Sequence, residues 1–190
     1  QLLELFARHQ LVWPKELTCS VSLRSWQTAR LSADAIEGLR AQALKINSTD
    51  QLCERSVGAL ANLTQDQIQT VLSKDPRVQG VPENWKIDPD FRLPVVGAES
   101  LKEAGFRVAQ YLVNYFAQFK EPMHGIPVIV GHGASIRHAA VQLGLLDESE
   151  LALLSMHHAL PMLWVRSDCL RGWTLKEGEW KKRHSDKHLD

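Results

Sequence analysis

A histidine between two glycines marks the point of the sequence best suited to chemistry. Residues 127–130 form a short, mostly β-branched apolar run, and His132 follows it between Gly131 and Gly133. Such a run predicts a buried strand, and residues 134–143 predict a helix that begins at once. Ligands of open α/β sheets bind at the carboxyl ends of the strands, and the free N–H groups of a helix start attract anions. The pattern therefore indicates either a phosphate site around His132 and Gly133 or a structural histidine in a tight turn.

An arginine near the start of another predicted helix is the second candidate. Residues 17–21 predict a strand and residues 24–39 a helix, which Ser20 or Ser22 is expected to cap. A cation in the first turn opposes the helix dipole, and a bound anion would resolve that conflict. Because guanidinium suits phosphate oxygens, Arg24 is either an anion ligand or a surface arginine with no partner.

Two glutamates add candidate chemistry. Glu54 lies between apolar residues in the predicted turn 52–58, where partial burial would raise its pKa and suit it to proton donation. The alternatives are a solvated carboxylate or a partner for Arg55. Glu99 precedes a predicted helix, where a negative charge is favourable, so we expect it to be mainly structural.

Composition sets mild bounds on function. The chain has 190 residues, with 22 Lys and Arg against 22 Asp and Glu, so its formal net charge is zero. Nothing global favours a nucleic acid or a membrane as partner, and no apolar run is long enough to span a bilayer. Cys19, Cys53 and Cys169 show neither metal-site spacing nor a disulfide framework. We therefore expect a reducing, cytoplasmic setting and no metal or cofactor.

The elements that must position these residues alternate between helices and short strands. The periodicity predicts further helices, strands and one polar turn: helices 1–9, 65–73, 100–119 and 147–154, strands 43–46, 162–165 and 173–175, and a turn at 47–50. Residues 76–98 predict a long irregular loop, a possible lid, and 181–190 a charged, solvated tail. The order predicts one α/β domain over 1–190, with helices on both faces of a mostly parallel sheet.

Taken together, these segments resemble the histidine phosphatase superfamily, in its phosphoglycerate mutase-like branch. That family looks like S-x-L-x-R-A-x-x-T-A, then L-x-E-x-x-x-G, then G-E-S opening a long helix, then V-x-H-G. The matching stretches here follow the same order: 20–29, 52–58, 97–100 and 130–133, with 185–189 similar to a closing N-D-x-x-H-L. The resemblance covers nearly the whole chain and implies a three-layer α/β/α fold.

The family's nucleophile is the main departure. Family members open with a strand that ends in Arg-His-Gly, and that histidine attacks phosphorus. This chain has Arg8-His9-Gln10, but residues 1–9 have helical periodicity and resemble the family's first helix. We therefore expect the nucleophile upstream of residue 1, with His9 or no nucleophile as the alternatives. Smaller departures are Ser25 in place of alanine and Ala98 inserted before Glu99.

The resemblance implies metal-independent hydrolysis of phosphomonoesters through a phosphohistidine intermediate. Arg24 and His132 match two of the family's four phosphate-pocket residues, and Glu54 matches the acid that protonates the leaving oxygen. Gly133 is a further candidate for substrate binding. The implied partner is a small phosphorylated substrate or phosphate, and the oligomeric state is left open. Four further residues are secondary candidates for substrate contact: Arg137, His138, His157 and His158. The alternative function is a non-catalytic phosphate-binding or scaffold domain.

Overall fold

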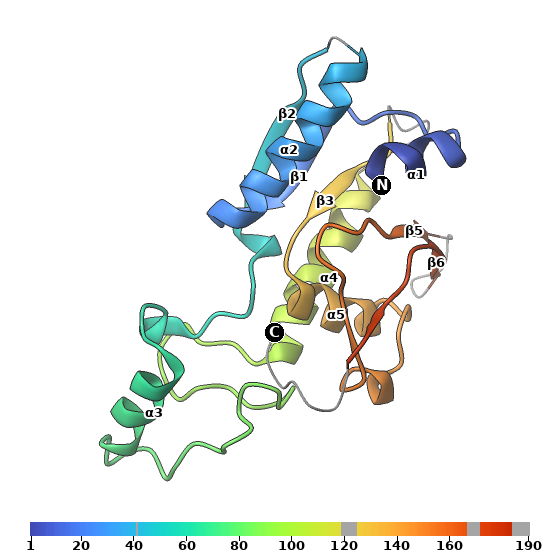
Figure 1. Ribbon diagram of the computed structural model, residues 1–190. Coiled ribbons are helices and arrows are strands. Elements are labelled where there is room, and N and C mark those ends of the chain that lie inside the picture. The colour runs from blue at the N-terminus through green and yellow to red at the C-terminus, as the bar shows by residue number, and fades with distance from the viewer. Residues whose placement is uncertain (41, 119–124, 167–171, 184–190) are drawn as a thin grey trace.

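The computed structural model describes residues 1–40, 42–118, 125–166 and 172–183 (Figure 1). The helices in these residues are α1 Leu2–Arg8, α2 Leu23–Arg40, α3 Gln65–Ser73, α4 Leu101–Ala117 and α5 Gly133–Gln142. The strands are β1 Glu16–Ser20, β2 Lys45–Thr49, β3 Val128–Val130, β4 Leu154–Ser155, β5 Leu163–Arg166, β6 Trp173–Glu177 and β7 Lys181–Lys182. Short 3-10 turns are η1 Asp50–Leu52, η2 Gly58–Leu60 and η3 Glu148–Glu150.

A parallel sheet in the order β2-β1-β3 forms the middle layer. Strand β1 alternates between the two faces, as a strand buried on both sides must. Leu17 packs in the cluster that contains Ala33 and Ile36 of α2, whereas the side chain of Thr18 lies near Tyr111 and Tyr115 of α4. Helices therefore cover both faces, and the α/β fold with a parallel central sheet is confirmed.

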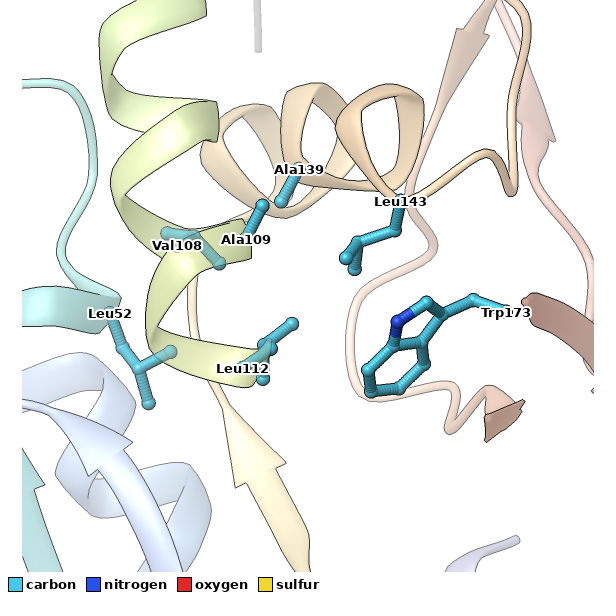
Figure 2. Packing of buried hydrophobic residues seen from close by; sticks show 7 residues of the cluster. All are labelled: Leu52, Val108, Ala109, Leu112, Ala139, Leu143 and Trp173. Atoms are coloured by element: carbon cyan, nitrogen blue, oxygen red, sulfur yellow. The ribbon is translucent and has the colours of Figure 1, made fainter. Parts of the chain in front are cut away.

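The larger apolar cluster lies between α4, α5 and β6. Its buried members, drawn in Figure 2, come from η1, from α4, from α5 with its C-cap and from β6: Leu52, Val108, Ala109, Leu112, Ala139, Leu143 and Trp173. Helices α4 and α5 cross closely at Gly105, where an added Cβ would lie 2.4 Å from Cβ of His138. This packing fixes the direction of α5 and, with it, the position of its first residue.

The segment between β2 and α4 has its own small core. Thr64 and Gln67 form the capping box that starts α3, and Trp85 is buried in a cluster with Leu60 and Ile68. Residues 76–98 contain neither helix nor strand, apart from a single bridge between Val57 and Ala98. In Figure 1 this segment lies apart from the central sheet, at the lower left.

Three predictions about local structure were wrong. The polar turn expected at 47–50 is largely strand, because β2 pairs with β1 as far as Ser20 and Thr49. The helix expected at 147–154 is only the turn η3 followed by β4. Lys181 and Lys182 are not simply a solvated tail, since they form β7, which pairs with β4. In each case long-range pairing overrides a local composition that suggests otherwise.

Other predictions lie wholly or partly outside the described residues. Helix α4 ends at Ala117, so the expectation that it reaches Phe119 falls on residues that the structure does not describe. The same holds for Cys169, for the remainder of the tail from 184 to 190 and for the family-like motif at 185–189.

Candidate functional site

The three parallel strands end at one edge of the sheet, and each is followed by one of the candidate residues. Cys19 pairs with Val130 and Ser20 pairs with Thr49, so β1, β2 and β3 finish almost level. Arg24 comes shortly after β1, Glu54 after β2 and His132 after β3. The carboxyl edge of a parallel sheet is where α/β proteins place ligand sites.

Ser25 ties two of these turns together. Its hydroxyl donates to the carbonyl oxygen of Val130 at 2.9 Å and accepts from the N–H of Ser20 at 3.2 Å. Ser25 is buried and stands where the family pattern has alanine. Its hydroxyl adds polar contacts between the end of β1 and the end of β3 that alanine cannot make.

The hydrogen bonds of His132 define its neutral tautomer. Nη2 of Arg24 lies 3.0 Å from Nδ1 of His132, and a guanidinium can only donate, so Nδ1 accepts. Nε2 therefore carries the hydrogen and donates it to the Ser20 hydroxyl at 2.7 Å, with the Ser22 hydroxyl at 3.2 Å. Protonation of Nδ1 would break the contact with Arg24.

The electrostatic surroundings favour the same neutral state. Burial lowers the pKa of His132, and the positive charges of Arg24 and Arg107 lower it further. The negative charge of Glu54 opposes them and raises the pKa. Glu54 therefore belongs to the same electrostatic site as Arg24 and His132, although no hydrogen bond joins it to either of them.

Glu54 and Glu99 are held in different ways. Glu54 is half-buried, and its Oε1 accepts from the N–H of Arg55 at 3.2 Å. Glu99 pairs with Arg107 through both carboxylate oxygens, each at 2.8 Å, and also accepts from the N–H of Ser56. Burial raises the pKa of Glu99, but the hydrogen bonds from Arg107 and Ser56 outweigh it and lower the pKa overall. Glu99 is thus fully engaged in structural contacts.

Gly133 is the first residue of α5, directly after the N-cap His132. The His132 side chain makes no capping hydrogen bond. A Cβ at Gly133 would meet only Met156, at the ordinary distance of 3.6 Å. The helix start therefore keeps backbone N–H groups that no side-chain cap from His132 occupies, the arrangement that binds anions.

The other candidates do not join this group. His9 follows α1, and its Nε2 contacts Glu177 of β6, as does Arg8. Nε2 of His157 lies 3.7 Å from Oε1 of Glu179, and His158 is exposed. Residues 2–8 form a helix, as their periodicity predicts, which leaves no strand ending at His9.

Arg137 and His138 are buried on α5, away from its first turn. Nη1 of Arg137 donates to the carbonyl oxygen of Leu154 at 2.8 Å, and Nδ1 of His138 donates to that of Ala134 at 2.8 Å. Burial lowers the pKa of His138, and that hydrogen bond only partly opposes it. These contacts anchor α5 rather than face the Arg24–His132 pair.

Sequence reasoning missed three polar side chains of the site. Ser20 and Ser22 were expected to cap α2, but their hydroxyls contact the ring of His132. Arg107 lies within the helix predicted over 100–119 but is not among the sequence candidates. Nothing local marks these residues, because their partners lie far away in the sequence.

The described residues contain no group of three or more His, Cys, Asp and Glu side chains that could hold a metal ion. Among these residues no helix combines the length and apolar character needed to cross a membrane. A cavity of about 240 Å³ borders Lys102, His138 and Glu148, but it does not include the Arg24–His132 pair.

Comparison with known proteins identifies the family of this chain. The family model of the histidine phosphatase superfamily (branch 1) matches residues 1–165. The chain therefore belongs to the histidine phosphatase superfamily. No curated protein matches the sequence significantly.

Solved structures share the fold at low sequence identity. A mycobacterial glucosyl-3-phosphoglycerate phosphatase in complex with VO3 is 20% identical, with a TM-score of 0.61 over 92% of this chain and 79% of that chain. The same phosphatase with inorganic phosphate is 17% identical, with a TM-score of 0.55 over 95% and 79%. A protein described as mycobacterial hydrolase 1 is 18% identical, with a TM-score of 0.56 over 95% and 79%.

Proposed function

We propose that this chain is the phosphate-binding part of a metal-independent phosphomonoesterase that works through a phosphohistidine intermediate. The observation that carries the proposal is the contact between Arg24 and His132 at the start of α5. It gathers a guanidinium, an imidazole N–H and uncapped backbone N–H groups at one edge of the sheet. Such donors stabilise the charge that spreads over the oxygens of a transferring phosphoryl group.

Each residue has a distinct role in the proposed reaction. Arg24, His132 and the backbone from Gly133 onward bind the phosphoryl oxygens. A histidine nitrogen attacks phosphorus, the ester P–O bond breaks, and Glu54 gives its proton to the leaving oxygen. Water then attacks the phosphohistidine and returns a proton to Glu54, which releases inorganic phosphate and free histidine. Residues 76–98 are proposed as a cover over this site.

The open edge of β3 supports a nucleophile supplied from upstream of residue 1. Within the described residues β3 pairs with β1 alone, and its other edge has no strand partner. A parallel strand added there would end at the same edge as β1 and β3. Its last residues would then lie beside His132, where a nucleophilic histidine is needed.

The structural neighbours support a phosphate ligand. Two of them are complexes of a glucosyl-3-phosphoglycerate phosphatase, one with VO3 and one with inorganic phosphate. We accordingly propose a phosphorylated small molecule or phosphate as the ligand here. The free thiols of Cys19 and Cys53 fit a reducing compartment, and the cytoplasmic setting stays a prediction.

Activity assays on two forms of the protein test the proposal. Residues 1–190 are expected to bind phosphate but to hydrolyse p-nitrophenyl phosphate poorly or not at all. A form extended upstream of residue 1 should hydrolyse it with or without a chelator, and should lose turnover by orders of magnitude in His132→Ala. Robust activity of residues 1–190 that disappears in His9→Ala would identify His9 as the nucleophile and overturn the upstream assignment.

The alternative function is phosphate binding without hydrolysis. It is favoured by one observation: among the described residues, no second histidine contacts the Arg24–His132 pair. An extended form that binds phosphate and lacks phosphatase activity would establish this alternative.

A further inference from the structure

One guanidinium on α4 binds most of the turn that carries Glu54. Nη1 of Arg107 donates to the carbonyl oxygens of Asp50 at 3.2 Å, Gln51 at 2.9 Å and Cys53 at 3.3 Å. Nη2 of Arg107 lies 3.4 Å from the carbonyl oxygen of Glu54 itself. These carbonyls belong to η1 and to the residues after it, so a single side chain holds the path of the backbone from β2 to Glu54.

Glu99 fixes the orientation of that guanidinium. Its two carboxylate oxygens accept from Nε and Nη2 of Arg107, each at 2.8 Å, so the pair is bidentate. Both side chains are largely shielded from water, with exposed fractions of 18% for Arg107 and 23% for Glu99. The remaining N–H groups of the planar fork therefore point in one direction, toward the turn.

The same glutamate holds the turn from its far side. Ser56 and Glu99 are joined twice, through the N–H of Ser56 to the Glu99 carboxylate and the N–H of Glu99 to the Ser56 carbonyl. Gly58 makes this approach possible, because a Cβ there would lie 2.3 Å from the carbonyl oxygen of Val96. Glu54 thus lies between two anchored points and has little freedom to move along the site.

From these contacts we propose that Arg107, oriented by Glu99, is the positioning residue that holds the Glu54 carboxylate beside His132. The proposal rests on the proposed function only for the chemical role of Glu54, not for its position. Lysine cannot replace Arg107, because one ammonium group cannot reach the carbonyls on one side and both Glu99 oxygens on the other.

The effect of Glu54 on the pKa of His132 offers a test of this proposal. If Arg107 only stabilised the fold, changing Arg107 would leave that effect the same. In residues 1–190 with native Arg107, Glu54→Gln should lower the pKa of His132, measured by NMR titration of its ring nitrogens, because a negative charge that favours the imidazolium is lost. Lysine at position 107 keeps the positive charge but lacks the planar guanidinium that binds the turn and Glu99 together. In the Arg107→Lys background the same Glu54→Gln change should therefore leave the pKa of His132 nearly unchanged.

One control variant and one substitute variant complete the test. Arg30→Lys alters another helical arginine that bridges two carboxylates, Asp34 and Glu37, and the Glu54→Gln shift should persist in that background. If Arg107→Lys does not fold, Glu99→Gln, which removes the charged anchor, should also diminish the shift.

Two results would overturn the proposal. One is an equal Glu54→Gln shift with and without Arg107→Lys, and the other is no shift in the parent chain, since Glu54 would then not lie beside His132. Because the titration needs no turnover, a lack of phosphatase activity would count against the proposed function and leave this inference standing.

Discussion

The Ser20 hydroxyl lies 2.7 Å from Nε2 of His132 and joins the end of β1 to the start of α5 across 112 residues of sequence. Together with Arg24 on Nδ1, it gives the imidazole a partner on each nitrogen. The ring is therefore held in one orientation and one tautomer before any ligand arrives. The neutral imidazole has only one N–H, so its bond to the Ser20 hydroxyl must be exchanged before the ring can donate to a bound phosphoryl group.

Arg24→Ala should weaken phosphate binding to residues 1–190. The change removes a charge-assisted contact worth about 1.5–3 kcal/mol, which corresponds to roughly tenfold to a hundredfold in affinity. Isothermal titration calorimetry with phosphate and vanadate measures the effect. Arg40→Ala is the control, because it removes the same charge from the opposite end of α2, and the affinity should then stay near that of the parent. Equal affinities for Arg24→Ala and the parent would exclude a role for Arg24 in binding.

Stability should fall as the pH drops below about 6.5, the ordinary pKa of histidine. His132 and His138 both have native pKa values lowered by burial, so the unfolded chain binds more protons than the native one in this range. The full stability is present above pH 6.5 and is lost as the pH falls toward the native pKa values, by at most about 1.4 kcal/mol per pH unit for each histidine.

Urea unfolding between pH 5 and 8 measures this dependence. His138→Asn retains a donor near the position of Nδ1, and His132→Gln retains one near Nε2. Each variant should reduce the dependence of the free energy of unfolding on pH. The double variant should reduce it more than either single variant. A profile that is unchanged in both variants would show that neither histidine causes the loss.

Glu54→Gln should slow hydrolysis most for substrates with poor leaving groups. A good leaving group departs as an anion and needs little protonation, whereas an alkoxide requires the proton that Glu54 supplies. In the active, upstream-extended form, the ratio of kcat/KM between p-nitrophenyl phosphate and an alkyl phosphate should rise by about 10²-fold or more. Glu4→Gln changes an exposed carboxylate of α1, outside the proposed site and its cover, and should leave the ratio unaltered. An equal loss on both substrates would argue against a general acid at position 54.

Two glycine substitutions in helices should have opposite effects on stability. In Gly105→Ala the new Cβ would lie 2.4 Å from Cβ of His138 and 2.7 Å from its carbonyl carbon, and overpacking of this kind costs about 1–3 kcal/mol or more. In Gly38→Ala no atom lies within 4 Å of the new Cβ, and lower unfolded-state entropy should add about 0.4–1 kcal/mol. Denaturation midpoints measured at one pH compare the two. A Gly105→Ala protein as stable as the parent would show that α4 and α5 do not pack so closely.

The sequence alone was enough to predict the local elements that carry their own signals. Helix α3 begins after Thr64 and ends at Ser73, as its capping box and apolar spacing indicate. The strand before Gly131 and the helix after His132 follow from an abrupt change of apolar period. Motif order across the chain was enough to indicate the histidine phosphatase superfamily, which the family model confirms over residues 1–165.

Only the tertiary structure decided where polar residues would pair. Asn47, Ser48 and Thr49 look like a turn by composition, yet they are strand because their backbone groups complete the ladder with β1. Ser20 and Ser22 look like helix caps, yet their hydroxyls face a histidine that the chain brings back from far along the sequence. Local propensity differs between such states by only about 1 kcal/mol, so long-range hydrogen bonds decide the outcome.

Arg107 shows the same division most clearly. The sequence predicts the helix that contains it, but an arginine on a helix carries no mark of the carbonyl groups that it will bind. Those partners come from a turn more than fifty residues earlier, and packing of α4 beside η1 brings them within reach. The sequence by itself determined which residues were candidates for the site. The tertiary structure decided how their side chains were oriented, because each orientation depends on contacts with residues that are distant along the chain.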